Sequence, residues 1–328
     1  MSEAVERFLR THADEFAVGQ QLHDVPPHVV CEVTFEGQRA VCKVSMEPRG
    51  NAGVEGRVQR SVDRETAVPV PEILAVGADG YVAGYDEDAP READYEDREL
   101  TGAWLRAAGR TLARLHGEVT FDRPGLLAVD GDPADPTAGL RVDSPPDATW
   151  SDALHSLLGV YEEAVRGTGH APVVADARWF VEEYADLFDE HAAEFDEHGE
   201  AALLHGWFTP EHAEVRDGET RCVVDFEHAL VGSPAWDYWR TAVPLFLGDG
   251  WDQPEGAAAT FRSAYESVRP LPADLDGCRE AYVGLVSVSY LDSLHTQTGI
   301  DEETEERAEW IASTASEQFD AARNAFAE

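Results

Sequence analysis

The chain has 328 residues and carries 65 acidic against 25 basic side chains, a formal net charge of −40. So negative a field argues against binding to nucleic acid or to an anionic membrane surface, since both are polyanions. The acid is spread along a chain of ordinary apolar content, 43%. We interpret it as a solvated surface adapted to high intracellular salt, with an acidic protein of ordinary habitat as the alternative.

Lys43 is the one lysine among the 25 basic residues, the others being arginine. A compact ammonium fits a phosphate as a point charge, which a planar guanidinium does not duplicate, so this lysine is a candidate binding residue; chance survival is the alternative. The four cysteines show no CxxC spacing and predict free, buried thiols in a reducing cytosol. No signal peptide and no apolar run of about 18 residues is apparent, which favours a cytoplasmic protein.

The first part of the chain predicts a small antiparallel sheet of about four strands with one helix on it. Alternating apolar residues and turn signals place the strands at 30–35, 39–45, 72–76 and 81–85. Helical periodicity covers 2–17 and 51–64. The turn at 24–27 contains no glycine, so no glycine-rich loop that wraps phosphate is visible.

The second part predicts a larger, mostly helical lobe. A polar connector at 86–97 precedes it, and 128–149, rich in Asp, Gly and Pro, is expected to be an irregular loop. Helical patterns cover 100–116, 150–165, 175–195, 236–246, 256–268, 275–295 and 302–326. We therefore expect two lobes, residues 1–88 and 89–328, with a cleft between them.

The segment 203–240 contains the most informative pattern. Two short strands flank an Asp217-Gly218 hairpin turn, and the second strand ends in Asp225-Phe226-Glu227. A carboxylate directly after an apolar strand is held on a rigid edge, which suits a metal ligand, although one acid after a strand is common.

Five positions occur in a familiar order: Lys43, Glu55, His205-Gly206, Asp225 and Asp237. With the surrounding sequences VCKV, VPVPE, LARLH, LHG and VDFE…GSPAWD, they resemble the aminoglycoside phosphotransferase and choline-kinase-like family. The resemblance implies an α+β, two-lobed protein-kinase-like fold with a small antiparallel β-rich N-lobe and a larger, mostly helical C-lobe.

The resemblance also implies roles. Lys43 would bind the α- and β-phosphates of ATP and pair with Glu55, while Asp225, with Glu227 as a second carboxylate, would hold Mg²⁺. Residues 81–87 would form the hinge beside an adenine. The alternatives are that Lys43 is a surface lysine on an edge strand and that Glu55 is simply one acid among 65.

The catalytic loop departs from the family pattern His-Gly-Asp-x₄-Asn. Trp207 stands at the Asp position and His212 at the Asn position. Indole has no acceptor, so Trp207 cannot take a proton, and imidazole is a poor Mg²⁺ ligand. Glu211 and His212 are candidates to replace the missing base; otherwise they are ordinary loop residues and Trp207 fills the place of an acceptor.

The sequence thus supports two functions. One is an ATP- and Mg²⁺-dependent phosphotransferase that acts on a small-molecule hydroxyl with a rearranged catalytic loop. The other is an inactive, pseudokinase-like protein that binds a nucleotide, a ligand or a partner. Under both, the resemblance implies that His205 and Asp237 are structural, with Asp237 bracing the catalytic loop from the start of a helix.

Overall fold

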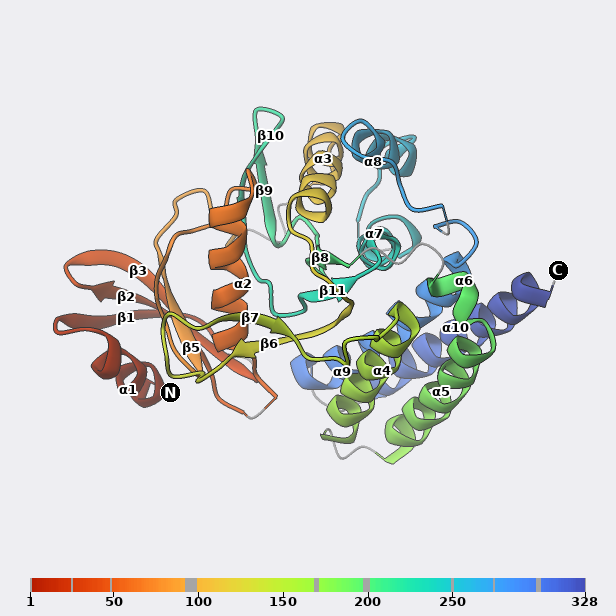
Figure 1. Ribbon diagram of the computed structural model, residues 1–328, viewed down its shortest axis with the longest axis horizontal. Coiled ribbons are helices and arrows are strands. Elements are labelled where there is room, and N and C mark those ends of the chain that lie inside the picture. Colours follow the sequence, from red (N-terminus) through yellow and green to blue (C-terminus); the bar gives the residue numbers. More distant parts are fainter. Residues whose placement is uncertain are drawn as a thin grey trace.

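The computed structural model describes residues 2–24, 26–47, 49–91, 99–167, 171–196, 201–248, 251–273, 275–298 and 302–327. The β-rich N-terminal part and the larger helical part lie side by side, as Figure 1 shows, and the two chain ends lie at opposite sides of the molecule. The predicted α+β, two-lobed architecture is therefore confirmed.

The N-terminal part is built on a five-stranded antiparallel sheet with the order β1-β2-β3-β5-β4. Helix α1 packs on it through a buried apolar face, and helix α2 lies between the sheet and the rest of the molecule (Figure 1). Its elements are α1 (Ser2–His12), β1 (Phe16–His23), β2 (His28–Phe35), β3 (Gln38–Ser45), α2 (Ala52–Glu65), β4 (Ile73–Val76) and β5 (Gly80–Gly84).

One strand of this sheet was not predicted. The helix expected over 2–17 ends at His12, and β1 begins at Phe16. β1 is an edge strand with mostly exposed side chains, so its sequence lacks the alternation that marks a half-buried strand. Residues 24–27, which contain no glycine, lie between it and β2 in the sequence.

The C-terminal part holds most of the helices around one large apolar core. Its elements are α3 (Gly102–Glu118), β6 (Gly125–Asp130), β7 (Gly139–Val142), α4 (Trp150–Gly167), α5 (Ala171–Glu190), α6 (Ala192–Asp196), β8 (Ala202–Leu204), β9 (Ala213–Arg216), β10 (Glu219–Val223), β11 (Leu230–Gly232), α7 (Pro234–Ala242), the π-helical turn η2 (Val243–Leu247), α8 (Ala257–Glu266), α9 (Arg279–Thr298) and α10 (Glu302–Ala327). β9 and β10 form the hairpin expected at Asp217-Gly218.

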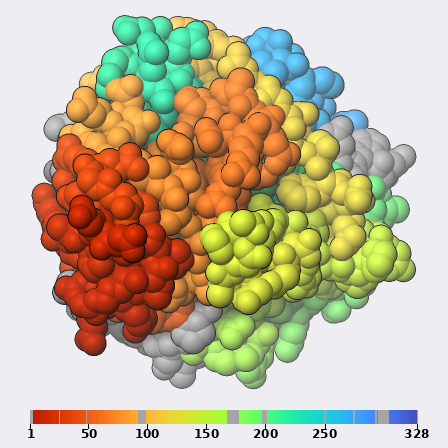
Figure 2. Space-filling model, turned by 60° about the vertical axis from the view of Figure 1, so that its left-hand side comes forward, coloured from red at the N-terminus to blue at the C-terminus, as the bar shows by residue number. Residues whose placement is uncertain are grey.

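The segment 128–149 corrects an expectation. Instead of an irregular loop it contains parts of β6 and β7, which pair with each other and extend to β11 and β8. Tertiary contact orders it: the buried Arg57 of α2 donates hydrogen bonds to the carbonyls of Pro133, Asp135 and Ala138. Figure 2 shows this yellow-green hairpin against the orange helix α2. The hairpin therefore ties α2 to the C-terminal part.

Smaller differences concern helix limits. The helix expected over 175–195 is divided into α5 and α6, and that over 236–246 ends in the π-helical turn η2. Residues 92–97 of the polar connector lie outside the described residues. The boundary between the two lobes, placed between residues 88 and 89, stays a prediction. All four cysteines are free and buried, as expected.

Candidate functional site

Lys43 is the centre of the site. It lies on β3, an inner strand between β2 and β5, so it is not a surface lysine on an edge. Its side chain is 8% exposed, and its Nζ lies 2.9 Å from Glu55 Oε2, 2.8 Å from Asp225 Oδ1 and 3.0 Å from Glu227 Oε2. Burial acts to lower the pKa of Lys43, but the three carboxylates outweigh it and raise that pKa well above its usual value.

Glu55 comes from the first turn of α2 and is fully buried. Its Oε1 accepts a hydrogen bond of 3.0 Å from the hydroxyl of Tyr81 on β5, while Oε2 faces Lys43. Burial raises the pKa of Glu55 and the Lys43 ammonium opposes that rise. The predicted ion pair is thus present. The hinge expected over 81–87 stays a prediction, and the Tyr81 hydroxyl at its start fixes Glu55.

Asp225 follows β10 with φ 67°, in the left-handed region that non-glycine residues rarely adopt. Such backbone strain persists where surrounding contacts determine the conformation. Here Val224 N donates to His212 O at 2.9 Å, and the Asp225 carboxylate is held by cations. Burial acts to raise the pKa of Asp225, but Lys43 and His212 hold it well below its usual range.

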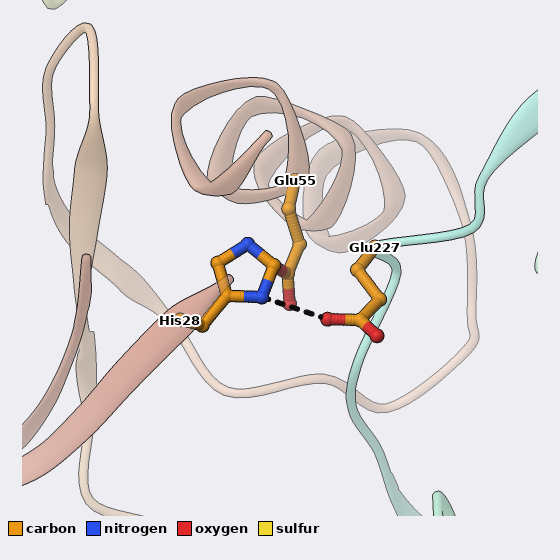
Figure 3. A group of neighbouring side chains, drawn as sticks. All are labelled: His28, Glu55 and Glu227. Atoms are coloured by element: carbon orange, nitrogen blue, oxygen red, sulfur yellow. Dashed lines mark ion pairs between the residues drawn. The ribbon is translucent and has the colours of Figure 1, made fainter. Parts of the chain in front are cut away.

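His28 is a member of the site that the sequence did not reveal. It opens β2, and its Nδ1 lies 3.1 Å from Glu227 Oε2. Figure 3 shows His28, Glu55 and Glu227 converging from a strand, a helix and the loop after β10. One ligand atom from each lies within 4.8 Å of the others. No local pattern around His28 marks it, because its partners come from distant parts of the chain.

The carboxylates fit a divalent cation. Asp225 and Glu227 both reach the one Lys43 ammonium, so their oxygens already converge on a common positive charge. Carboxylate oxygens are the ligands that Mg²⁺ prefers. The imidazole of His28 would instead favour a transition metal at that edge of the cluster.

Asp237 braces the catalytic loop, as the resemblance implied. It lies in the first turn of α7, and its carboxylate accepts hydrogen bonds from His205 N at 2.7 Å and Gly206 N at 2.8 Å. His116 Nε2 bonds the same carboxylate at 2.9 Å. Burial acts to raise the pKa of Asp237, and these partners lower it overall. Gly206 has φ 81°, and a Cβ there would lie 2.3 Å from the His228 carbonyl oxygen.

His205 also has a structural role. Its Nδ1 accepts a hydrogen bond from Trp207 N at 3.2 Å, so its Nε2 carries the proton and donates to Val224 O at 3.1 Å. Burial is the main cause that lowers the pKa of His205 to about 4. The neutral ring thus connects the catalytic loop to the strand end that carries Asp225.

Trp207, at the Asp position of the family pattern, presents an indole instead of a carboxylate. Its ring lies against aromatic and cationic neighbours: the Arg240 guanidinium is 5.1 Å from the ring centroid and the Tyr290 ring is 5.3 Å away. Glu211, the predicted substitute base, accepts a hydrogen bond of 3.3 Å from Thr209 Oγ1. Its proposed part in proton transfer stays a prediction.

His212 binds the metal-binding candidate Asp225 directly. Its Nε2 lies 3.2 Å from Asp225 Oδ2 and its Nδ1 lies 2.9 Å from Trp207 O. Burial acts to lower the pKa of His212, but the Asp225 carboxylate raises it to about 9. A protonated imidazole has no acceptor nitrogen. In this arrangement His212 is placed to donate to Asp225, and its predicted part in proton transfer stays a prediction.

The fold has two lobes. Its first lobe carries a lysine on a strand and a glutamate on a helix, and its second lobe carries an aspartate directly after a strand. These features together define the protein-kinase-like class of phosphotransferases. The family model described as "Phosphotransferase enzyme family" matches residues 30–280, and the chain belongs to this family. No curated protein matches the chain.

Solved structures of low sequence identity share the fold. A putative aminoglycoside phosphotransferase of Ralstonia eutropha is 13% identical with a TM-score of 0.60, covering 99% of this chain and 98% of that one. A thermostable mutant of aminoglycoside phosphotransferase APH(4)-Ia, in ternary complex with ADP and hygromycin B, is 18% identical with a TM-score of 0.59, covering 96% of this chain and 98% of that one. Macrolide 2′-phosphotransferase MphH of Brachybacterium faecium is 15% identical with a TM-score of 0.53, covering 96% and 98%.

Proposed function

We propose that this chain binds Mg-ATP between its two lobes and transfers the γ-phosphoryl group to a hydroxyl of a small molecule. The observation that carries the proposal is the convergence of Glu55, Asp225 and Glu227 on the single lysine, Lys43. A buried ammonium held by a helix carboxylate is the arrangement that kinase-like enzymes use to bind nucleotide phosphates.

Each residue has a part in the proposed mechanism. Lys43 neutralises and positions the phosphates, and Glu55, itself fixed by Tyr81, orients Lys43. Asp225 and Glu227 would hold Mg²⁺, which when bound neutralises charge on the phosphates. His212 orients Asp225 through its second oxygen.

The acceptor hydroxyl meets no base at Trp207. Phosphoryl transfer passes through a loose transition state in which positioning and charge neutralisation carry most of the catalysis. Absence of a general base costs about 10²–10⁴ in rate. The proposal is accordingly a slow phosphotransferase, unless Glu211 supplies the base from the neighbouring loop.

A second candidate is a protein that binds a nucleotide, another ligand or a partner without transfer. The observation that favours it is the state of Asp225, whose two oxygens contact the Lys43 ammonium and the His212 ring, next to a loop that carries Trp207. The first candidate requires nucleotide affinity at Lys43 and turnover, whereas the second requires no turnover and is compatible with nucleotide binding.

One experiment separates these readings. The melting temperature of the protein at high salt is measured with and without Mg-ATP, for the native chain and for Lys43→Ala. A shift in the native chain that Lys43→Ala abolishes supports nucleotide binding at Lys43. Equal shifts in both proteins contradict the role of Lys43, and no shift in either protein contradicts nucleotide binding itself. ADP release is then followed with amino sugars, choline-like alcohols, sugars and hydroxy acids, and transfer to any of these excludes the second candidate.

The proposal also concerns cellular context. We place the lobes at 1–88 and 89–328, expect a cytoplasmic protein, and expect a small-molecule substrate rather than nucleic acid or membrane, on the ground of the net charge of −40. Within the described ranges, none of the helices combines the length and the apolar character that crossing a membrane requires.

A further inference from the structure

Arg240 is a buried cation for which the described part of the chain supplies no ion-paired carboxylate. It lies on α7, three residues after Asp237, and is 4% exposed. Among the described residues, no carboxylate forms an ion pair with it, although the chain has 65 acidic residues. Its hydrogen bonds go to neutral oxygens: the Gly206 carbonyl, the Tyr161 hydroxyl at 3.1 Å and Ser289 Oγ at 2.7 Å.

Neutral partners leave the charge of Arg240 only partly compensated. Burying a charge is costly unless it is paired, and aromatic faces repay a fraction of that cost. The guanidinium lies 5.1 Å from the ring centroid of Trp207, 5.6 Å from that of Trp236 and 5.9 Å from that of Tyr161. Nε and Nη1 donate the hydrogen bonds given above, and no described residue accepts one from Nη2. The guanidinium thus keeps donor capacity at Nη2, and none of the described carboxylates forms an ion pair with it.

Tyr290 on α9 supplies a second donor at the same place. Its hydroxyl is buried and has no hydrogen-bond partner among the described residues. Its ring stands edge-on to Trp207 with the centroids 5.3 Å apart. Burial raises the pKa of Tyr290, the Arg240 charge acts to lower it, and the Glu211 carboxylate acts to raise it, so both charges act on this hydroxyl. Two donors without acceptors therefore lie next to Trp207.

Trp207 marks the acceptor side of the site, because its position in the family pattern faces the acceptor hydroxyl. We propose that Arg240 and Tyr290 form an oxyanion subsite beside Trp207, and that the small-molecule acceptor is a hydroxylated compound bearing a carboxylate or a phosphate. The N–H groups of Arg240 Nη2, from which no described residue accepts, can donate a charge-assisted hydrogen bond to an oxygen of either group. A cationic amino sugar would instead place positive charge against Arg240. That the bound anion is the phosphoryl acceptor rests on the proposed function; that it binds here does not.

The test compares matched ligands that differ in charge. Binding to the native protein, with Mg-ADP present, is measured by calorimetry at constant ionic strength for glycerol and glycerate, for ribose and ribose 5-phosphate, and for glucose and glucosamine. We expect an anionic member to bind about tenfold or more tightly than its neutral counterpart. The carboxylate and phosphate pairs identify which oxyanion source is preferred.

The variants are Arg240→Met, Arg240→Lys and the control Arg262→Met, which removes an exposed arginine of α8 paired with Asp276. Arg240→Met should abolish the anion preference, Arg240→Lys should retain part of it, and the control should retain all of it. Should Arg240→Met fail to fold, Tyr290→Phe, which removes the hydroxyl alone, is the second variant and should weaken anion binding severalfold.

Three outcomes overturn the proposal. Neutral or cationic members bind as well as the anions; or the preference survives in Arg240→Met or, where that variant does not fold, Tyr290→Phe binds the anions as tightly as the native protein; or no ligand of the panel binds. Its failure is separable from that of the proposed function. Loss of Mg-ATP binding with anion binding intact contradicts the phosphotransferase reading alone, while Mg-ATP binding without any anion preference contradicts the subsite alone.

Discussion

His212 Nε2 lies 3.2 Å from Asp225 Oδ2, while Lys43 Nζ lies 2.8 Å from Asp225 Oδ1. The carboxylate that kinases use for metal is thus flanked by an ammonium and by an imidazole whose pKa is raised to about 9. An asparagine at position 212 would offer an amide oxygen in place of a positive charge. The substitutions at 207 and 212 therefore change both charge and proton handling in one loop.

Restoring the family loop should increase turnover. The double variant Trp207→Asp/His212→Asn returns a carboxylate to the acceptor side and an oxygen ligand beside Asp225. We expect phosphoryl transfer, measured as ADP release with the best acceptor or with water, to rise by about 10²–10⁴. Trp207→Phe/His212→Gln changes the same positions without supplying the carboxylate, and it should not accelerate transfer. An unchanged rate in the restored variant would show that the defect lies outside this loop.

Removing Lys43 should affect stability as well as affinity. Lys43→Met leaves three carboxylates facing one another without their shared cation, and breaking such buried pairing costs about 3–5 kcal/mol. Urea denaturation should show this loss, with part of it regained in Lys43→Met/Glu55→Gln because one of the repelling charges is gone. Lys43→Arg keeps the charge and serves as the control. A double variant no more stable than Lys43→Met would contradict the repulsion.

The sequence predicted those parts of the site that have local signatures. Lys43 lies in an alternating strand and Asp225 follows an apolar strand, so pattern and spacing located both. His28, Tyr81 and Arg240 have no such signature, because their partners are distant in the sequence: His28 meets Glu227, for example, across the two lobes.

Local signatures also decide which parts of the fold the sequence predicts. The helices of the second lobe were predicted from their helical periodicity. Strand β1 is exposed and β6–β7 is rich in glycine, proline and aspartate, so neither carries the strand pattern. The hairpin around residues 130–139 is ordered by hydrogen bonds from Arg57, a contact that no local pattern contains. Tertiary contact, rather than propensity, decided these segments.

His205 should make the protein sensitive to mild acid. Its ordinary pKa is 6.5 and burial lowers it to about 4, so the unfolded chain binds a proton between these values and the folded chain does not. Stability therefore falls as the pH drops below 6.5, by up to about 1.4 kcal/mol per pH unit for this one group. A proton on Nδ1 would face the N–H of Trp207 and break that hydrogen bond.

The matched variant is His205→Gln, which keeps a donor and an acceptor but does not titrate. Urea denaturation at pH 7.0, 6.0 and 5.2, above the sequence pI of about 4.4, should show the native protein losing its advantage over the variant as the pH falls. A stability difference that stays constant over this range would mean that His205 is not buried in its neutral form.

Salt should stabilise the chain strongly. A net charge of −40 produces self-repulsion in the folded state, and raising the ionic strength from 0.1 to 1 M shortens the screening length from about 10 Å to about 3 Å. We expect the melting temperature to rise steeply over this range of KCl and to level off beyond it. Sucrose at matched osmolality, which is excluded from surfaces without screening charge, is the control and should give a smaller rise. A melting temperature that is flat or falls in KCl would contradict salt adaptation, and equal responses to both solutes would assign the stabilisation to exclusion rather than to screening.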